Sequence, residues 1–261
     1  MNKPIYPTDL TDSQWEYIRE LIPPAKPGGR PQSLEMRQIV NALLYGVVGG
    51  IQWRMLPKDY PHWKSVYHYF RRWRDDGPWQ RIHDTLRAAV RQKSGRHPHP
   101  TAGCLASQSV KTTAIAGLRG DDAGKKVCGR KRHIVVDTMG VLLAVIVTAA
   151  SIHDRDGAKL VLGRLRGACK NLRRMGVDGG YRGQLLVWVA AHCRYRLTVV
   201  LRSDDQKGFV VVPRRWIVER TFAWLNHNRR LSKDDEGCTT TSESMIYRAM
   251  IRLMLRRLSR V

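Results

Sequence analysis

One stretch of the sequence, residues 93–103, separates two parts whose apolar residues recur with different periods. It reads Lys-Ser-Gly-Arg-His-Pro-His-Pro-Thr-Ala-Gly, a composition typical of a linker because Pro and Gly interrupt helices and strands. Before it, apolar residues recur every three or four residues, which is the period of an amphipathic helix. After it, short apolar runs are bounded by turn residues, which indicates strands. We therefore predict a helical domain over residues 1–92 and a mixed domain over residues 104–261.

The first part is expected to contain helices joined by short turns. They are expected over residues 8–22, 33–48, 64–75 and 78–92. The third of these is basic and aromatic, which is typical of a helix-turn-helix-like DNA-binding module. We expect it to enter a major groove, with these side chains directed toward DNA: Lys64, His68, and Arg71 or Arg72. The alternative is an all-helical core with a solvated basic face.

The second part begins with strands and ends with helices. Strands are expected over residues 104–110, 133–137, 141–148, 172–177 and 197–201, and helices over residues 157–170, 183–193, 214–227 and 242–258. Residues 133–148 have the pattern of a β-hairpin, because Thr-Met-Gly separates two apolar runs. The last helix is expected to dock on the sheet. Periodicity alone predicts only a mixed sheet with covering helices.

The net charge of the chain, +24 at pH 7, is the main indication of a partner. A field this positive favours an anionic polymer, and residues 1–100 carry +7 of it while the remainder carries +17. We therefore expect the C-terminal part to face the polyanion itself. No run of 18 apolar residues occurs, so no membrane span is expected. The five cysteines are widely spaced and lack a C-x-x-C pair, which argues against a zinc site and for a reduced, cytoplasmic setting.

Two acidic residues, Asp178 and Glu219, are candidates for a functional site. Asp178 ends an apolar run and precedes two glycines, and the ends of strands are where ligand sites form in α/β sheets. Glu219 lies in a predicted helix that is rich in Arg and Trp. Each residue also has a structural explanation, which is loop capping for Asp178 and an ion pair for Glu219. The polar group of His153, Asp154 and Asp156 is interpreted as a helix-capping loop rather than as a metal cluster.

Several ordered motifs extend over nearly the whole chain, residues 8–258. They are Ala-Ser-Gln-Ser-Val-Lys-Thr-Thr at 106–113, Gly-Lys-Lys-Val-Cys-Gly-Arg-Lys-Arg-His-Ile-Val-Val-Asp at 124–137, Asp-Arg-Asp-Gly at 154–157, Asp-Gly-Gly-Tyr-Arg at 178–182, and Pro-Arg-Arg-Trp-Ile-Val-Glu-Arg-Thr-Phe-Ala-Trp at 213–224. Together they resemble bacterial insertion-sequence transposases of the insertion sequence 5 type, and residues 28–77 are similar to that family's N-terminal helical domain. The resemblance implies an α/β fold, in which a ribonuclease-H-like, integrase-type catalytic domain follows a small all-α, helix-turn-helix-like domain.

The resemblance also implies a DDE active site, in which two Asp and one Glu bind two Mg²⁺ ions, with Mn²⁺ as an alternative ion. Such ions take oxygen ligands, and a pair roughly 4 Å apart activates the nucleophile and stabilises the leaving oxygen. Asp178 matches the second acid, Glu219 matches the third, and Arg215 matches an arginine that steers a phosphate. The first acid is absent, because Ala106 stands where the family has Asp. Asp137, on the next strand, is a conceivable substitute.

The function implied by the resemblance is a DNA transposase that binds the ends of its mobile element and catalyses Mg²⁺-dependent strand cleavage and strand transfer. This chain is expected to be inactive because of Ala106, which is either an engineered replacement or the mark of a decayed copy. The expected partner is double-stranded DNA, both the terminal inverted repeats of the element and the target DNA. A homodimer on DNA is also expected, and the expected location is the cytoplasm of a bacterium, in association with the nucleoid. Further DNA contacts are expected from Lys125, Lys126, Arg130 and Lys131. Two alternatives stay open: a non-catalytic, sequence-specific DNA-binding protein, and a structure-specific nuclease.

Overall fold

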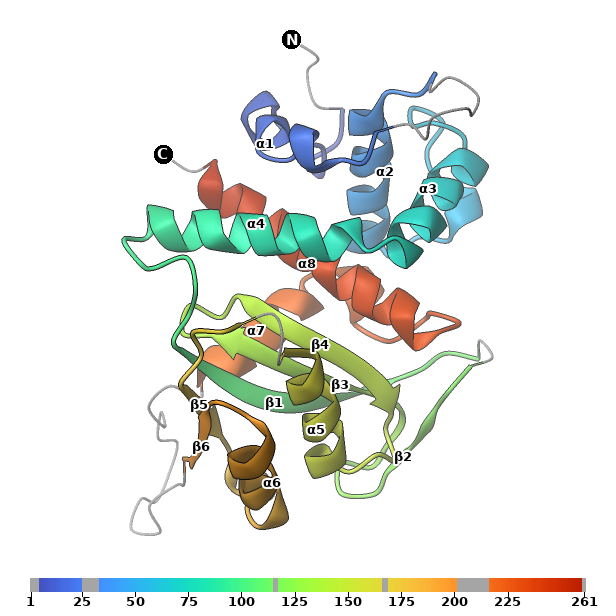
Figure 1. The fold of residues 1–261 in the computed structure, drawn as a ribbon. Coiled ribbons are helices and arrows are strands. Elements are labelled where there is room, and N and C mark those ends of the chain that lie inside the picture. Colours follow the sequence, from blue (N-terminus) through green and yellow to red (C-terminus); the bar gives the residue numbers. More distant parts are fainter. Residues whose placement is uncertain (1–4, 25–32, 115–116, 166–168, 201–215, 260–261) are drawn as a thin grey trace. The chain divides into compact units, whose positions relative to one another are not determined.

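The structure is a computed structural model that describes residues 5–24, 33–114, 117–165, 169–200 and 216–259. Its chain forms two compact units (Figure 1). Unit 1 comprises residues 1–96, 227–232 and 244–261, and unit 2 comprises residues 97–226 and 233–243.

Unit 1 is helical. It contains α1 (Asp12–Glu16), α2 (Met36–Gly49), α3 (Trp63–Asp75), α4 (Pro78–Lys93) and most of α8 (Thr239–Leu258), together with 3-10 turns at Arg19–Leu21, Trp53–Met55 and Arg229–Leu231. The apolar stripes expected from the sequence form its core, since Leu43, Phe70 and Trp73 are each 1% exposed. The short turn lies between α3 and α4, where Gly77 has a φ of 72° that a residue with a side chain rarely adopts. The connection between α2 and α3 is longer and includes the turn Trp53–Met55.

The first helix is shorter than expected. The sequence predicts a helix over residues 8–22, but α1 ends at Glu16 and a separate 3-10 turn follows it. The start is set locally, because Thr11 and Gln14 form a capping box with two hydrogen bonds of 3.2 Å. The residue before it is held by a distant partner, since the Leu10 N–H donates to the side chain of Asn41 at 3.0 Å. Hydrophobic periodicity contains no information about such a contact.

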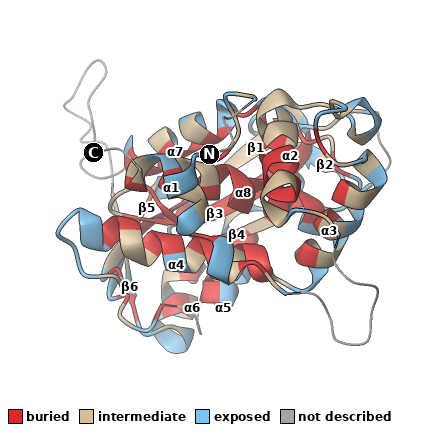
Figure 2. Ribbon diagram, turned by 90° about the horizontal axis from the view of Figure 1, so that it is seen from above, coloured by how far each residue is buried: buried red, intermediate tan, exposed pale blue. Residues whose placement is uncertain are grey.

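From residue 244 onward, α8 belongs to unit 1. The sequence-based expectation docks this helix on the sheet of the second domain. In unit 1, however, the guanidinium of Arg248 lies 4.3 Å from the centre of the Phe70 ring. Residues 242–251 are all buried (Figure 2). The compact units thus divide the chain differently from the sequence-based domains at the C-terminal end, and a linker at 93–103 stays a prediction.

Unit 2 is a mixed sheet with helices. Its elements are β1 (Ala102–Lys111), β2 (Gly120–Asp122), β3 (Val127–Asp137), β4 (Leu142–Ala149), α5 (Asp154–Leu165), β5 (Arg174–Val177), a 3-10 turn (Gly179–Tyr181), α6 (Gln184–His192), β6 (Arg196–Val199) and α7 (Trp216–Asn226). The main strands are ordered β4-β3-β1-β5-β6, and β2 pairs with the start of β3. β3 is antiparallel to β1 and β4, whereas β1, β5 and β6 are parallel. This is the ribonuclease-H-like arrangement, so the expected fold class is confirmed.

Helices cover both faces of this sheet (Figure 1). On one face, α5 and α6 pack over an apolar cluster that includes Leu105 of β1, Val161 and Leu185. On the other face, α7 packs against β1 and β3. Because successive side chains of a strand point to opposite faces, Leu105 faces α5 and α6 while Ala106 faces α7. The fold therefore directs position 106 toward the helix that carries Glu219.

Candidate active site and nucleic-acid interface

A pocket of about 290 Å³ in unit 2 brings together three segments that are distant in the sequence. Residues of β1, of the end of β5 and of α7 line it, and Ala106, Asp178 and Glu219 are among them. The other lining residues are Cys104, Leu105, Ser107, Gly176, Val177, Val200, Val218 and Phe222. A concave site at the ends of strands, with apolar walls and a few polar groups, is typical of ligand binding. The three positions at which the sequence predicts the catalytic acids thus line one pocket.

Asp178 lies directly after β5, at its carboxyl end. It is the N-cap of the 3-10 turn Gly179–Tyr181, and its Oδ1 accepts a hydrogen bond of 2.9 Å from the Gly180 N–H. This bond orients the carboxylate beside the strand end that lines the pocket. Asp178 therefore both caps the 3-10 turn and lines the pocket.

Glu219 lies in the first turn of α7, and its side chain is exposed. Val218 and Phe222 of the same helix are 3% and 8% exposed, and both also line the pocket. These apolar contacts fix α7 on the sheet, so the position of the Glu219 carboxylate follows from the burial of its neighbours. Arg215, which was expected to steer a phosphate, lies outside the described residues.

Arg220 stacks between two tryptophans of α7, a contact that the sequence analysis did not single out. Its guanidinium lies 4.3 Å from the centre of the Trp216 ring and 4.6 Å from that of Trp224. Its Nη2 also donates to the Met139 carbonyl at 3.1 Å, in the turn after β3. Residues four apart meet on a helix surface, so the spacing Trp-x-x-x-Arg-x-x-x-Trp could have predicted this stack. Arg220 thereby braces the helix that carries Glu219.

Ala106 places a methyl group in the pocket where the family resemblance expects the first Asp. The conceivable substitute, Asp137, is paired with Gly103 in the β1–β3 ladder, three residues from position 106 and therefore about 10 Å along the strand. The Asp137 side chain is fully buried, and its Oδ1 accepts hydrogen bonds of 2.8 Å from the N–H groups of Met139 and Val141. Asp137 shapes the turn after β3 and does not line the pocket.

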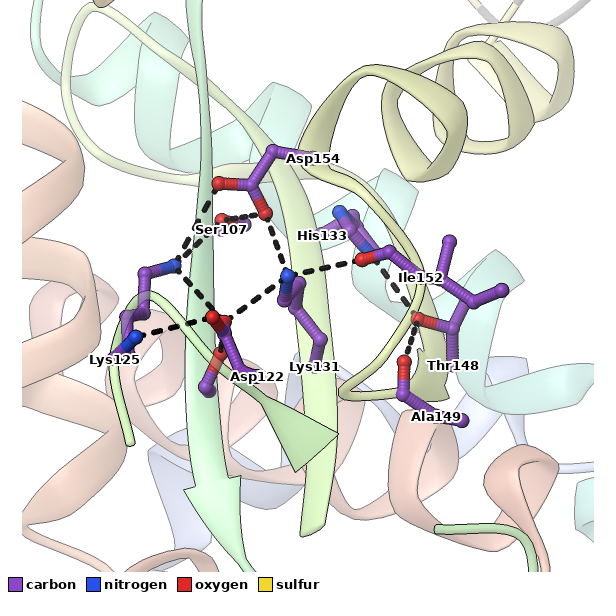
Figure 3. Close-up of polar contacts among 10 residues, drawn as sticks. Ser107, Asp122, Lys125, Lys131, His133, Thr148, Ala149, Ile152 and Asp154 are labelled. Carbon is purple, nitrogen blue, oxygen red and sulfur yellow. Dashed lines mark hydrogen bonds and ion pairs between the residues drawn. The ribbon is translucent and has the colours of Figure 1, made fainter. Parts of the chain in front are cut away.

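A charged network lies on the opposite face of β1 (Figure 3). Lys131 Nζ is 3.0 Å from Asp122 Oδ2 and 3.1 Å from Asp154 Oδ1. The hydroxyls of Ser107 and Ser109 donate to Asp154 at 2.8 Å and to Asp122 at 2.6 Å, respectively. Burial opposes the ionisation of Asp122, but hydrogen bonds from Ser109 and Lys131 outweigh it and lower the pKa of Asp122 to about 2. Because Ser107 also lines the pocket, this network holds the pocket-lining part of β1 in place.

Arg130 and Lys131, two residues expected to contact DNA, are only 1% and 5% exposed. Arg130 Nη1 is 2.9 Å from Asp234, and its Nε and Nη2 donate to the carbonyls of Leu118 and Gly237. Lys131 is enclosed by the network described above. Side chains that are buried and neutralised inside the unit do not present charge to a phosphate, so their placement corrects the expectation of DNA contacts at both positions.

Lys125 and Lys126, between β2 and β3, are exposed. Lys125 Nζ lies 3.8 Å from Asp122 and 3.7 Å from Asp154 (Figure 3), and exposed ion pairs of this kind are weak. Lys126 has a φ of 52°, in the left-handed region that tight turns require. DNA contacts by these two residues stay a prediction.

On α3, the basic residues differ in exposure. Lys64, His68 and Arg71 are exposed, and their spacing of four and three residues puts them on one face of the helix. Arg72 is partly buried, with its Nε 3.6 Å from Asp76. The face that carries the first three residues is therefore the best placed for a DNA contact, which stays a prediction.

The side chains in the pocket do not fit the pair of metal ions that the DDE resemblance implies. That pair takes three carboxylates, whereas the pocket has those of Asp178 and Glu219 and the methyl group of Ala106. Within the described ranges of the chain, no group of three or more His, Cys, Asp or Glu side chains could hold a metal ion. The pocket therefore offers two carboxylates where the resemblance implies three.

Known proteins resemble both parts of the chain. Residues 10–83 match the family described as putative transposase of the IS4/5 family, and residues 97–254 match the transposase DDE domain. A putative transposase for insertion sequence element IS402 of Burkholderia cepacia is 33% identical over 110 residues, which are 40% of this chain and 52% of that protein. A 16.2 kDa uncharacterized protein of the same element is 32% identical over 99 residues, 35% of this chain and 63% of that protein. Uncharacterized protein y4sN of Sinorhizobium fredii is 34% identical over 68 residues, 26% of this chain and 54% of that protein.

The chain thus spans between about half and two thirds of the length of these curated relatives. None of the helices in the described part is both long and apolar enough to cross a membrane. The match to the DDE domain covers more than half of the chain, and the IS4/5 match precedes it in the order that the motifs predict. The chain therefore belongs to the DDE transposases of the IS4/5 type.

Proposed function

We propose that this transposase binds the ends of a mobile element, and that the pocket lined by Ala106, Asp178 and Glu219 corresponds to the site of DNA cutting in its family. One observation carries the proposal: the three positions matched to the family's acids come from β1, β5 and α7 and line one pocket. A chance alignment of motifs would not make distant positions converge. The strand-end location is also where α/β folds place their ligands.

We infer that this chain, with alanine at position 106, does not cut DNA itself. DDE transposases typically use divalent metal ions, which we expect to be Mg²⁺ or Mn²⁺ in relatives with a complete site. These ions prefer oxygen ligands, and Mg²⁺ requires near-ideal octahedral geometry. The methyl group of Ala106 supplies no ligand. DNA binding does not depend on that ligand, so the chain is proposed to bind without cutting.

We propose that unit 1 supplies the choice of DNA sequence. The exposed face of α3 carries Lys64, His68 and Arg71, which extend over about 10 Å of helix. A helix fits the major groove, where each base pair presents a distinct pattern of donors and acceptors. Terminal inverted repeats and target DNA are the proposed partners. We also propose a homodimer on DNA, since two ends must be processed and a two-fold assembly gives each end a site.

The test is to restore the missing carboxylate. Ala106→Asp is expected to cut duplexes that carry the element's ends when Mg²⁺ is added, whereas the unmodified chain leaves them intact. Ala106→Asn is the matched control, because it has nearly the same shape and lacks the negative charge. Adding Asp178→Ala or Glu219→Ala to Ala106→Asp is expected to abolish cutting again.

If the unmodified chain cuts as fast as Ala106→Asp, position 106 is not the first acid. Asp137→Asn in the unmodified chain would then show whether the neighbouring strand supplies the missing carboxylate. The affinity for DNA is measured in parallel. It should change little on Ala106→Asp, or fall slightly, because a negative charge is added near the phosphates.

A second candidate is a non-catalytic, sequence-specific DNA-binding protein, such as a decayed or domesticated transposase. The methyl group at position 106 favours it. This function differs from an inactivated transposase in what Ala106→Asp does. A variant that binds the ends, contains all three acids and still leaves DNA intact would favour the binding protein, because further parts of the active site would then also have been lost.

A further inference from the structure

A group of basic residues in unit 2 lies at the other end of the strands from Asp178. Between residues 157 and 200, the sequence contains nine Lys and Arg residues and a single acidic one, Asp178. Six exposed side chains of this segment form what we call the β5–β6 patch: Lys170, Arg173, Arg174, His192, Arg194 and Arg196. All six precede β5 or β6 or lie at the first residue of one of them, whereas Asp178 follows the last residue of β5.

The backbone places the arginines of this patch side by side. Arg174 is the partner of Arg196 in the parallel β5–β6 ladder. The Arg196 N–H donates to the Arg173 carbonyl at 2.9 Å. Neighbouring strands are about 4.8 Å apart, so three guanidinium groups start from one short edge of the sheet.

A cavity of about 280 Å³ belongs to the same patch. Lys170, His192 and Arg194 line it, and its apolar walls are Leu165, Cys169, Leu172 and Tyr195. The imidazole of His192 is held in place, because it stacks on Trp188 with ring centres 4.9 Å apart and its Nδ1 lies 2.8 Å from the Trp188 carbonyl oxygen. The patch therefore combines a concave surface with at least one oriented nitrogen-bearing ring.

Within the described ranges of the chain, no carboxylate pairs with the cations of the patch, since none of these six side chains forms an ion pair with Asp or Glu. Lys159 of the same unit, by contrast, is paired with Asp156 at 3.3 Å. Clustered cations repel one another, and a polyanion that binds them relieves this repulsion.

We propose that the β5–β6 patch binds the phosphodiester backbone of duplex DNA, away from the pocket at Asp178. The inference rests on the proposed function, because it takes DNA as the substrate. β5 has four residues and is therefore about 13 Å long, so a backbone held at its start lies beyond the phosphate that would react at its end. DNA at the patch is accordingly flanking or target DNA. Backbone contacts do not read bases, so the patch contributes to the binding of any duplex.

The experiment compares two full-length variants that lose the same charge. Lys170→Gln with Arg194→Gln removes two cations of the cavity. Arg19→Gln with Lys159→Gln removes two surface cations that are paired with carboxylates, at 3.1 Å for Arg19 and Glu16 and 3.3 Å for Lys159 and Asp156. The affinity for an end-bearing duplex and for a random duplex is measured by fluorescence anisotropy over a range of salt concentrations.

The patch variant is expected to reduce the slope of log affinity against log salt by about 1.8, since each lost phosphate contact removes about 0.9. The reduction should be equal for the two duplexes, and the control should keep the slope of the unmodified chain. An unchanged slope in the patch variant, or an equal change in the control, would overturn the proposal.

A second measurement covers the case in which the patch variant does not fold. In the unmodified chain, acylation of lysines with and without DNA, read by mass spectrometry, should show protection of Lys170 and none of Lys159. Equal labelling of Lys170 in both states contradicts the proposal. If the proposed function itself is wrong, the unmodified chain binds neither duplex. That result is distinct from the failure of the patch proposal, in which the unmodified chain binds DNA and Lys170 is labelled equally with and without it.

Discussion

Residues 130–132 of β3 and the set Lys64, His68 and Arg71 of α3 are both strongly basic in sequence, yet the structure treats them in opposite ways. The three side chains of β3 are 1%, 5% and 1% exposed. Those of α3 are exposed on one face of a helix. The difference lies in the partners. β3 is paired on both sides and has packed layers on both of its faces, whereas no described residue of unit 1 covers the face of α3 that carries these three side chains.

The comparison shows that the residues behind the net charge of +24 have two different roles. Part of the charge holds unit 2 together, as in the buried pair of Arg130 and Asp234 at 2.9 Å. Another part stays at the surface, where it can neutralise phosphates. Removing a buried cation should therefore affect stability, and removing an exposed one should affect DNA binding.

The largest effect is expected from Arg130→Met. It removes the ion-pair partner of the Asp234 carboxylate, which is 3% exposed, and breaking one side of a buried pair costs about 3–5 kcal/mol. Chemical denaturation monitored by circular dichroism gives the free energy of unfolding. Arg71→Met on α3 is the control and should change it by less than about 0.5 kcal/mol. Similar losses in the two variants would remove the distinction between the two groups.

A smaller effect is expected from pH, through His133, the next residue of β3. Its ring is fully buried and packs against Gly157, and burial lowers its pKa to about 4, from an ordinary value of 6.5. The unfolded chain therefore binds a proton between about pH 6.5 and pH 4 while the folded chain does not. Stability should fall as the pH is lowered through this window, by a total on the order of 3 kcal/mol.

The measurement is the free energy of unfolding at several pH values between 7 and 4. His133→Gln should remove most of this dependence. His68→Gln, at an exposed position of α3, should leave it unchanged. If the two variants follow the pH profile of the unmodified chain equally well, His133 is not the group responsible.

The smallest effect is expected from substitutions on α3. They should change the free energy of DNA binding and leave the free energy of unfolding unchanged. Lys64→Gln with Arg71→Gln removes two exposed cations, which should lower the salt slope of DNA binding by about 1.8. Sequence preference should also decline, since a lost base contact costs about 1–3 kcal/mol of discrimination. Arg74→Gln is the control, because Arg74 pairs with Asp75 at 2.7 Å. An undiminished preference for the element's ends would mean that another element reads the sequence.

Much of the fold could be predicted from the sequence, because helices and strands depend on neighbours a few residues away. The stripe of Val66, Phe70 and Trp73 predicts a helix over 64–75, and the structure has α3 at Trp63–Asp75. The apolar run before Asp178 likewise predicts the strand that became β5. The site positions came from a different source, the family resemblance, since periodicity says nothing about which strand ends meet in a pocket.

By itself, then, the sequence predicted most of the local elements and the family, and it predicts that Ala106 stands in place of the first acid. Only the tertiary structure decided that Arg130 and Lys131 are buried, that Asp137 shapes a turn, and that α8 belongs largely to unit 1. The physical reason is the separation of the partners. Arg130 meets Asp234 across 104 residues, and such a contact exists only after the sheet has formed and excluded water from both side chains.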